Sequence, residues 1–171
     1  GKVRPLGQSH GGWNYDRNKY GAYLVSHHDT EIFSLTQLFL NREIWGIDAH
    51  TLDKERCMQA DEQNSGYIPC ALVEQTYIDT LTTYLALYRD KLGVQPPIKL
   101  IAGMTGVEGY QMAAPPGMNF GALARLGGRV VHECIEYEAI INSLDDDPVT
   151  ILRPFFEHVW DECGLTRPDK V

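Results

Sequence analysis

The residues that could bind a phosphate or a metal ion, or act as an acid or base, lie mainly between positions 103 and 138 of this 171-residue chain. Gly103, Gly106 and Gly109 follow an apolar segment at three-residue spacing, a pattern that can bring backbone N–H groups close to a phosphate. A phosphate loop also needs a helix N-terminus behind it, but an Ala-Ala-Pro-Pro run follows at 113–116 and Glu108 adds negative charge. The Walker and Rossmann spacings are absent. We therefore interpret this segment as a structural turn.

Segment 130–141 is predicted to be a strand, and one of its faces carries potential metal ligands. These are His132, Cys134, Glu136 and Glu138. Residues two apart on a strand are about 6.6 Å apart, whereas zinc bonds measure about 2.0–2.3 Å. At most two neighbours could share one ion, and the other ligands would have to come from distant histidines. We favour a solvent-facing polar stripe and predict no metal ion or other cofactor.

An enzyme is the alternative that these residues keep open. Its site, of the hydrolase kind, would form where a loop at 103–128 meets the strand at 130–141. Glu108, His132 and Cys134 would be the candidate groups, with the glutamate or the histidine as acid or base. No GxSxG elbow supports a serine nucleophile. Nothing in the sequence selects one cysteine as a nucleophile.

A second signal lies near the N-terminus, where Trp13, Tyr15 and Arg17 alternate with small or polar residues. Exposed aromatic residues and arginine commonly anchor protein interfaces. We expect residues 1–19 to be a linker or interface loop, with these three residues and Tyr110 as contacts. The alternative, that Trp13 folds back onto the edge of the core, is equally compatible with the sequence.

The elements that must position these residues follow from periodicity. Segments 20–28, 30–40 and 43–48 alternate with period two and are joined by short turns, which predicts an antiparallel meander. Apolar residues at spacings of three and four predict a long amphipathic helix over 68–92, ended by Gly93 and covering one face of the sheet.

The second half of the chain adds a short buried strand at 98–102, the loop at 103–128 and the strand at 130–141. Asp147-Pro148 predicts the start of a helix over 148–162, kinked or divided at Pro154. The expected order is βββ-α-β-β-α, an α+β fold in a single domain over 20–171.

Composition excludes several classes of function. The net charge is −8, and all of it lies in residues 61–171, which carry sixteen acidic and eight basic residues. Such a surface repels nucleic acid, so direct binding of DNA or RNA is not expected. No apolar run approaches the roughly 20 residues of a membrane span. The cysteines are few and widely spaced, which indicates reduced thiols and a cytoplasmic location.

Four stretches carry a resemblance to a known family: GGWNYDRNKYGAYLVS at 11–26, LFLNREIWGIDA at 38–49, IAGMTGVEGYQM at 101–112 and RPFFEHVWDECGL at 153–165. Together they resemble the C-terminal region of bacterial proteins that begin with a Schlafen-type AlbA-like domain. Those proteins are generally described as DNA-binding proteins or transcriptional regulators.

The resemblance implies an accessory domain rather than an enzyme, because the functions of such proteins are attributed to the AlbA-like part. We therefore expect a non-catalytic domain that senses a ligand, forms oligomers or docks onto an upstream domain of the same polypeptide. The leading Gly1 agrees with a fragment of a larger protein.

Overall fold

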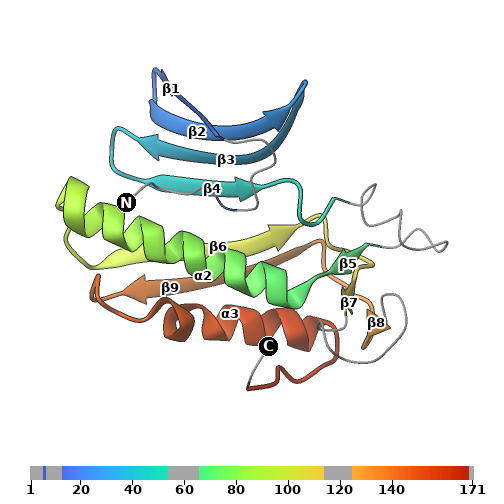
Figure 1. The fold of residues 1–171 in the computed structure, drawn as a ribbon. Coiled ribbons are helices and arrows are strands. Elements are labelled where there is room, and N and C mark those ends of the chain that lie inside the picture. The colour runs from blue at the N-terminus through green and yellow to red at the C-terminus, as the bar shows by residue number, and fades with distance from the viewer. Residues whose placement is uncertain (1–5, 7–12, 54–65, 114–124, 170–171) are drawn as a thin grey trace.

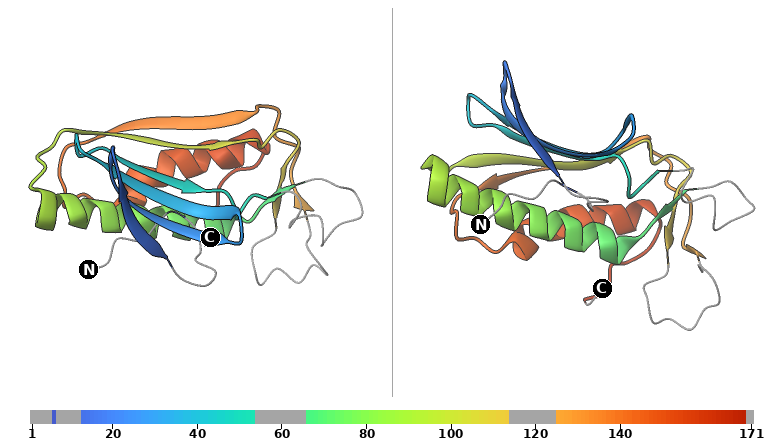
Figure 2. Two further views of the ribbon diagram at one scale, coloured as in Figure 1. Left: turned by 90° about the horizontal axis from the view of Figure 1, so that it is seen from above. Right: turned by 45° about the horizontal axis from the view of Figure 1, so that its top comes forward.

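The computed structural model describes residues 6, 13–53, 66–113 and 125–169. It confirms an α+β fold in which strands form one layer and two helices cover one side of it (Figure 1). Within this layer a four-stranded sheet and a two-stranded ribbon lie side by side, with α2 and α3 on the same side of the ribbon (Figure 2). A small three-stranded sheet lies at one end.

The four-stranded sheet is an antiparallel meander in the order β1-β2-β3-β4. Its strands are β1 (Asn14–Asn18), β2 (Gly21–His28), β3 (Glu31–Phe39) and β4 (Ile44–Asp48). The last three confirm the predicted meander. The prediction of a loop over 1–19 is wrong at its end, because β1 pairs with β2 from Asn14↔Val25 to Asn18↔Gly21. All five residues of β1 are exposed, so no apolar alternation marks it as a strand.

The ribbon pairs β6 (Ile98–Thr105) with β9 (Cys134–Ile141) in antiparallel register from Ile98↔Ile141 to Thr105↔Cys134. Strand β6 is therefore three residues longer than the predicted 98–102. The predicted loop over 103–128 also contains β7 (Gln111–Ala113) and β8 (Arg125–Leu126), which form the small sheet with β5 (Tyr67–Ile68).

Strand β9 begins four residues later than predicted. The residues before β9 form hydrogen bonds with the turn at 107–110 instead. Val130 donates its N–H to the Tyr110 carbonyl, and Val107 donates its N–H to the Glu133 carbonyl. Val131, which an extended strand over 130–141 would place on the face opposite His132 and Cys134, is 74% exposed. From residue 134 onward the predicted alternation holds, with Ile135 and Ile141 buried.

The long predicted helix is present as α2 (Cys70–Leu87), continued by one π-helical turn, η1 (Tyr88–Leu92). Gly93 ends it in the left-handed conformation, with φ of 58°, as a glycine at this position allows. The last helix, α3 (Pro148–Glu162), has the predicted bounds. Asp147 caps it by accepting hydrogen bonds from the N–H groups of Val149 and Thr150. The helix runs through Pro154 without dividing.

One core joins the helices to the ribbon. Phe155 and Phe156 of α3 are almost completely buried, as are Ile135 and Ile141 of β9. Val73, Leu81 and Leu85 of α2 belong to the same apolar cluster.

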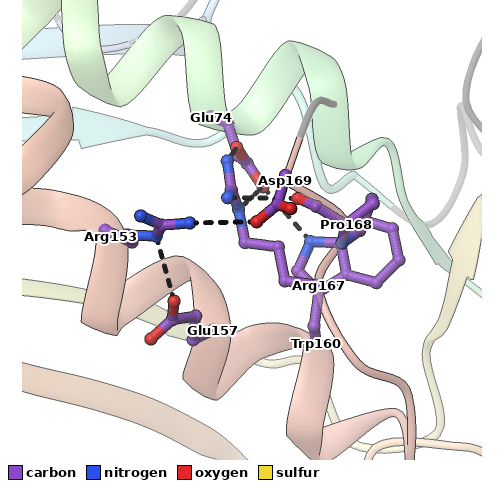
Figure 3. A network of polar contacts seen from close by, with 7 residues as sticks. All are labelled: Glu74, Arg153, Glu157, Trp160, Arg167, Pro168 and Asp169. Atoms are coloured by element: carbon purple, nitrogen blue, oxygen red, sulfur yellow. Dashed lines mark hydrogen bonds and ion pairs between the residues drawn. The ribbon is translucent and has the colours of Figure 1, made fainter.

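A buried ion pair fastens the C-terminal segment to this core (Figure 3). Arg167 donates to both carboxylate oxygens of Glu74 on α2, at 2.9 and 2.6 Å, and Trp160 donates its indole N–H to the same carboxylate at 3.2 Å. The Arg167 guanidinium also lies 5.9 Å from the centre of the Phe156 ring. The pair thus links α2, α3 and the segment that follows α3.

Candidate ligand-binding cleft

The residues predicted as N-terminal anchors lie on and beside the edge strand β1. Tyr15 is 60% exposed, and its hydroxyl accepts a hydrogen bond of 3.1 Å from Nε of Arg17. This bond raises the pKa of Arg17. Trp13 is half-buried, and its indole nitrogen is enclosed without a hydrogen-bond partner. Tyr15 and Arg17 are therefore an exposed, hydrogen-bonded pair, whereas Trp13 is partly buried.

The residues predicted around 108–134 differ in their surroundings. Tyr110 is 3% exposed, and its hydroxyl donates to the Leu52 carbonyl, so it is a core residue and not a surface anchor. Glu108 lies exposed in a turn. The His132 ring is bonded at Nδ1 to Glu162 of α3, over 2.7 Å, and this contact lowers the pKa of Glu162. Among the described residues, no hydrogen bond joins Glu108, His132 and Cys134.

The structure instead has a cavity of about 530 Å³ between the meander, the ribbon and α2. Strand β4 forms one wall, β6 forms the opposite wall, and α2 forms the floor. The volume lies within the usual range of about 300–1,000 Å³ for small-ligand sites. The lining side chains are mainly apolar, with most of the hydroxyls contributed by α2; besides two aspartates they are Leu6, Ile44, Ile47, Ala49, Thr51, Leu52, Val73, Thr76, Tyr77, Thr80, Leu81, Tyr84, Leu100, Ile101, Ala102, Met104, Thr105 and Leu152.

The cavity exists because the strand layer is interrupted. Strand β4 pairs only with β3 and β6 pairs only with β9 within the described part of the chain. The Cα atoms of β4 and β6 are more than 8 Å apart at nearly every position, whereas paired strands lie about 4.8 Å apart. Two strand edges therefore face each other across the cavity.

Two tyrosines of α2 fix the polar character of the floor. The Tyr77 hydroxyl donates to the Gly103 carbonyl of β6 at 2.6 Å, and the Tyr84 hydroxyl bonds to Thr36 of β3 at 2.7 Å. Burial raises the pKa of Tyr77 well above its usual range and raises that of Tyr84 to about 12. Both side chains remain neutral at physiological pH and brace the two walls.

The charge of the cleft is negative. Asp48, at the end of β4, lines it and accepts hydrogen bonds at one oxygen from the N–H groups of His50 and Thr51, at 2.8 and 3.0 Å. Asp53 lines the same end. The described lining includes no Lys, Arg or His. Because like charges repel, these carboxylates disfavour anionic ligands.

The sequence contains a signal for this floor that periodicity alone does not reveal. Thr76, Thr80 and Tyr84 follow one another at i, i+4 and i+8, which places three hydroxyl groups on one helix face. Within a stripe expected to be apolar, such a ladder indicates a face that does not pack against a dry core. The strand edges opposite it depend on tertiary structure and give no local signal.

No protein-family model, curated protein or solved structure matches this chain. In the described part of the chain, no group of three or more His, Cys, Asp or Glu side chains is placed to hold a metal ion. None of the described helices combines the length and apolar character that crossing a membrane requires.

Proposed function

We propose that this chain is a non-catalytic ligand-sensing domain and that the cleft between β4, β6 and α2 receives the ligand. The observation that carries the proposal is the 530 Å³ cavity, walled by two unpaired strand edges and floored by a helix. Cavities of this size with mainly apolar walls and a few placed polar groups are typical of ligand sites.

The polar groups of the cleft favour binding over catalysis. The hydroxyls of Tyr77 and Tyr84 are already engaged with Gly103 and Thr36, and the Asp48 carboxylate caps a turn. Groups held in this way can orient a ligand, but no nucleophile paired with a base is present among the described lining residues. The alternative of a hydrolase site between 103–128 and 130–141 gains no support, because no hydrogen bond joins Glu108, His132 and Cys134 among the described residues.

The chemistry of the walls indicates an apolar ligand that is neutral or positively charged. Asp48 and Asp53 supply the only formal charges of the described lining. Nucleotides, phosphates and simple carboxylates would be repelled by these carboxylates.

The regulatory setting of the domain rests on the sequence resemblance alone. In the proposed arrangement an upstream part of a bacterial regulatory protein contacts nucleic acid, and this acidic domain reports ligand binding to it. The exposed pair of Tyr15 and Arg17 on the free edge of β1 offers a contact surface for that upstream domain or for a second copy.

Blocking the floor of the cleft tests the proposal. Thr76→Trp fills the cavity from α2, whereas Thr82→Trp makes the same replacement on the exposed face of that helix. Ligand-observed NMR would compare 4-phenylbutylamine, 4-phenylbutanol and 4-phenylbutyrate on the unmodified chain and both variants. We expect the amine and the alcohol to bind, the carboxylate to bind more weakly, and Thr76→Trp alone to abolish binding. Binding that Thr76→Trp leaves intact, or no binding of any probe, would overturn the proposal.

A further inference from the structure

We propose that the strand layer docks an amphipathic helix of a protein partner on the side that faces away from α2 and α3, with lysine or arginine flanking the apolar stripe of that helix. We call this side the outer face; both described long helices lie on the opposite side of the ribbon (Figures 1 and 2). The inference goes beyond the proposed function, because it concerns a partner protein and not the ligand of the cleft.

The outer face of β4 carries Trp45 and Ile47. A Cβ at Gly46 would lie 2.7 Å from the Tyr84 hydroxyl of α2, so Gly46 faces the helix. Successive residues of a strand point to opposite sides, and Trp45 and Ile47 therefore point away from α2. They are 54% and 45% exposed.

The ribbon contributes Ile101 and Ile140 to the same side. Ala102 of β6 and Ile141 of β9 are buried in the core that the ribbon shares with the helices, so the residues before them point outward. The register pairs Lys99 with Ile140, which makes Ile140 a diagonal neighbour of Ile101 on one face. These two isoleucines are 58% and 55% exposed.

The four exposed side chains form one apolar group across the two parts of the layer. Ile47 and Ile101 both line the cleft, so the pair on β4 and the pair on the ribbon meet there. The Phe39 ring of β3 extends the group, because it packs edge-on against Trp45 with ring centres 5.4 Å apart. Single apolar residues on a surface are ordinary, but a group that includes tryptophan is typical of a protein interface.

A helix is the element that suits this face. Sheets in domains are covered by helices or by a second sheet, and the inner side of this layer already carries two helices. Strands β6 and β9 have eight residues each, a length of about 27 Å. A helix of about 18 residues has the same length, and its apolar stripe would cover the group.

Carboxylates surround the apolar group in both parts of the layer. Asp16 lies in the same cross-strand row as Trp45. Glu43 accepts a hydrogen bond of 2.7 Å from the Trp45 indole, and this bond lowers the pKa of the glutamate. On β9, Glu136 is exposed and shares the face of Ile140. A helix that docks here would meet negative charge along its flanks.

The positive charge of the outer face does not balance these carboxylates. Among the strand residues of this face, Lys99 is the one lysine or arginine, and it already pairs with Glu138 at 2.6 Å. Within the described residues, Asp16, Glu43 and Glu136 form no ion pair. A second copy of the chain would set like charges against each other, because a two-fold interface uses the same patch twice. Lysine or arginine of a partner would supply the complementary charge.

Selection from a phage-displayed library of 18-residue helical peptides tests the class of partner. The whole chain is the bait. We expect enrichment of sequences with apolar residues at i, i+3, i+4 and i+7 and with lysine or arginine beside this stripe. A library that yields no binder, or binders with acidic flanks, would overturn the proposal.

Calorimetry of the best peptide on surface variants tests the location. Trp45→Ala is expected to weaken binding by about tenfold or more, since tryptophans dominate interface energies. Ile140→Thr, which lies outside the lining of the cleft, is expected to weaken it by about fivefold. Val149→Thr at the start of α3 is the control, because Val149 is 44% exposed but belongs to the helix side. Unchanged affinity in Ile140→Thr, or an equal loss in Val149→Thr, would overturn the docking surface.

The role of charge is tested by the double variant Glu43→Gln, Glu136→Gln. At low salt we expect it to weaken the lysine-flanked peptide by about threefold to tenfold. Asp79→Asn with Asp161→Asn changes the net charge equally, at exposed positions of α2 and α3. Equal weakening by the two double variants would mean general attraction to an acidic chain and would overturn the charge complementarity.

Two other occupants would be recognised by separate measurements. A dimer in light scattering that Trp45→Ala dissociates would mean that a second copy covers the outer face. Co-sedimentation with vesicles of phosphatidylcholine and phosphatidylglycerol, abolished by Trp45→Ala, would mean that a lipid surface covers it. Either result overturns the proposal of a basic helix.

Discussion

Glu74 shows at the scale of single residues why a buried charge is retained in this fold. Glu74 lies on α2, and the residue is only 6% exposed. Two hydrogen bonds from Arg167 and one from Trp160 satisfy it (Figure 3). The carboxylate in turn raises the pKa of Arg167, chiefly through their hydrogen bonds. The pair therefore fixes where the segment after α3 lies.

Removing either partner of this ion pair should destabilise the protein strongly. Glu74→Ala leaves the guanidinium of Arg167 and the indole N–H of Trp160 without their acceptor, and Arg167→Ala leaves a buried carboxylate with reduced compensation. We expect each change to lower the free energy of unfolding by about 3 kcal/mol. The double variant should lose less than the sum, with a coupling of about 1–3 kcal/mol. Urea denaturation of the four proteins measures this cycle.

Arg153 and Glu157 of α3 provide the matched control. They form an i, i+4 ion pair at 3.1 Å, and about half of each side chain is exposed. The same cycle on this pair should give a coupling of only about 0.3–0.5 kcal/mol. A coupling for Glu74 and Arg167 no larger than this would contradict the structural role of the buried pair.

At the scale of elements, α3 shows what a proline inside a helix does. Pro154 lies on the exposed face of the helix and lacks the N–H that would bond to the Thr150 carbonyl. The helix nevertheless continues, because Leu152, Phe155, Phe156, Val159 and Trp160 anchor both halves to the core. Tertiary packing thus overrides a local preference of about 3 kcal/mol.

Pro154→Ala should therefore stabilise the protein. The change restores one backbone hydrogen bond and relieves the clash of the ring, but it loses the restriction that proline places on the unfolded chain. We expect a net gain of about 2 kcal/mol in the free energy of unfolding. Thermal denaturation measures it, with Asp161→Ala on the same exposed side of α3 as the control for helix propensity. A loss of stability would show that the backbone has adapted to the ring.

The helices could be predicted from sequence because their signals are local. The Asp147-Pro148 pair predicted the start of α3, and the apolar stripe predicted α2 with its last turn. Strand β6 was predicted too short because Gly103 resembles a turn residue. In the structure this glycine allows close strand pairing: a Cβ there would lie 2.8 Å from the Ile135 carbonyl oxygen of β9.

The cleft could not be predicted, because it depends on the distance between segments about fifty residues apart. Strand β4 and strand β6 each have ordinary strand patterns, and nothing in either sequence says that they fail to pair. The ladder of Thr76, Thr80 and Tyr84 was visible in the sequence, but its meaning depends on the gap above it. The contact between His132 and Glu162 of α3 likewise joins residues far apart in the sequence and has no local signal.

At the scale of the whole molecule, the chain is a strand layer broken in the middle and bridged by one helix. Tyr84 contacts the meander through Thr36, and Tyr77 contacts the ribbon through Gly103, so α2 spans the break (Figures 1 and 2). Within the described residues, side chains of the helix layer connect the two parts, and no β-ladder does so.

Hydrogen exchange can test whether this break persists in solution. Alternate amides of β4 and of β6, including those of Ile101 and Thr105, face the cleft and have no ladder partner in the described structure. They should exchange faster than the amides of β3, which is paired on both sides, by on the order of tenfold or more. Equal protection of β3, β4 and β6 would mean that the layer closes in solution, and the cleft would then have no room for a ligand.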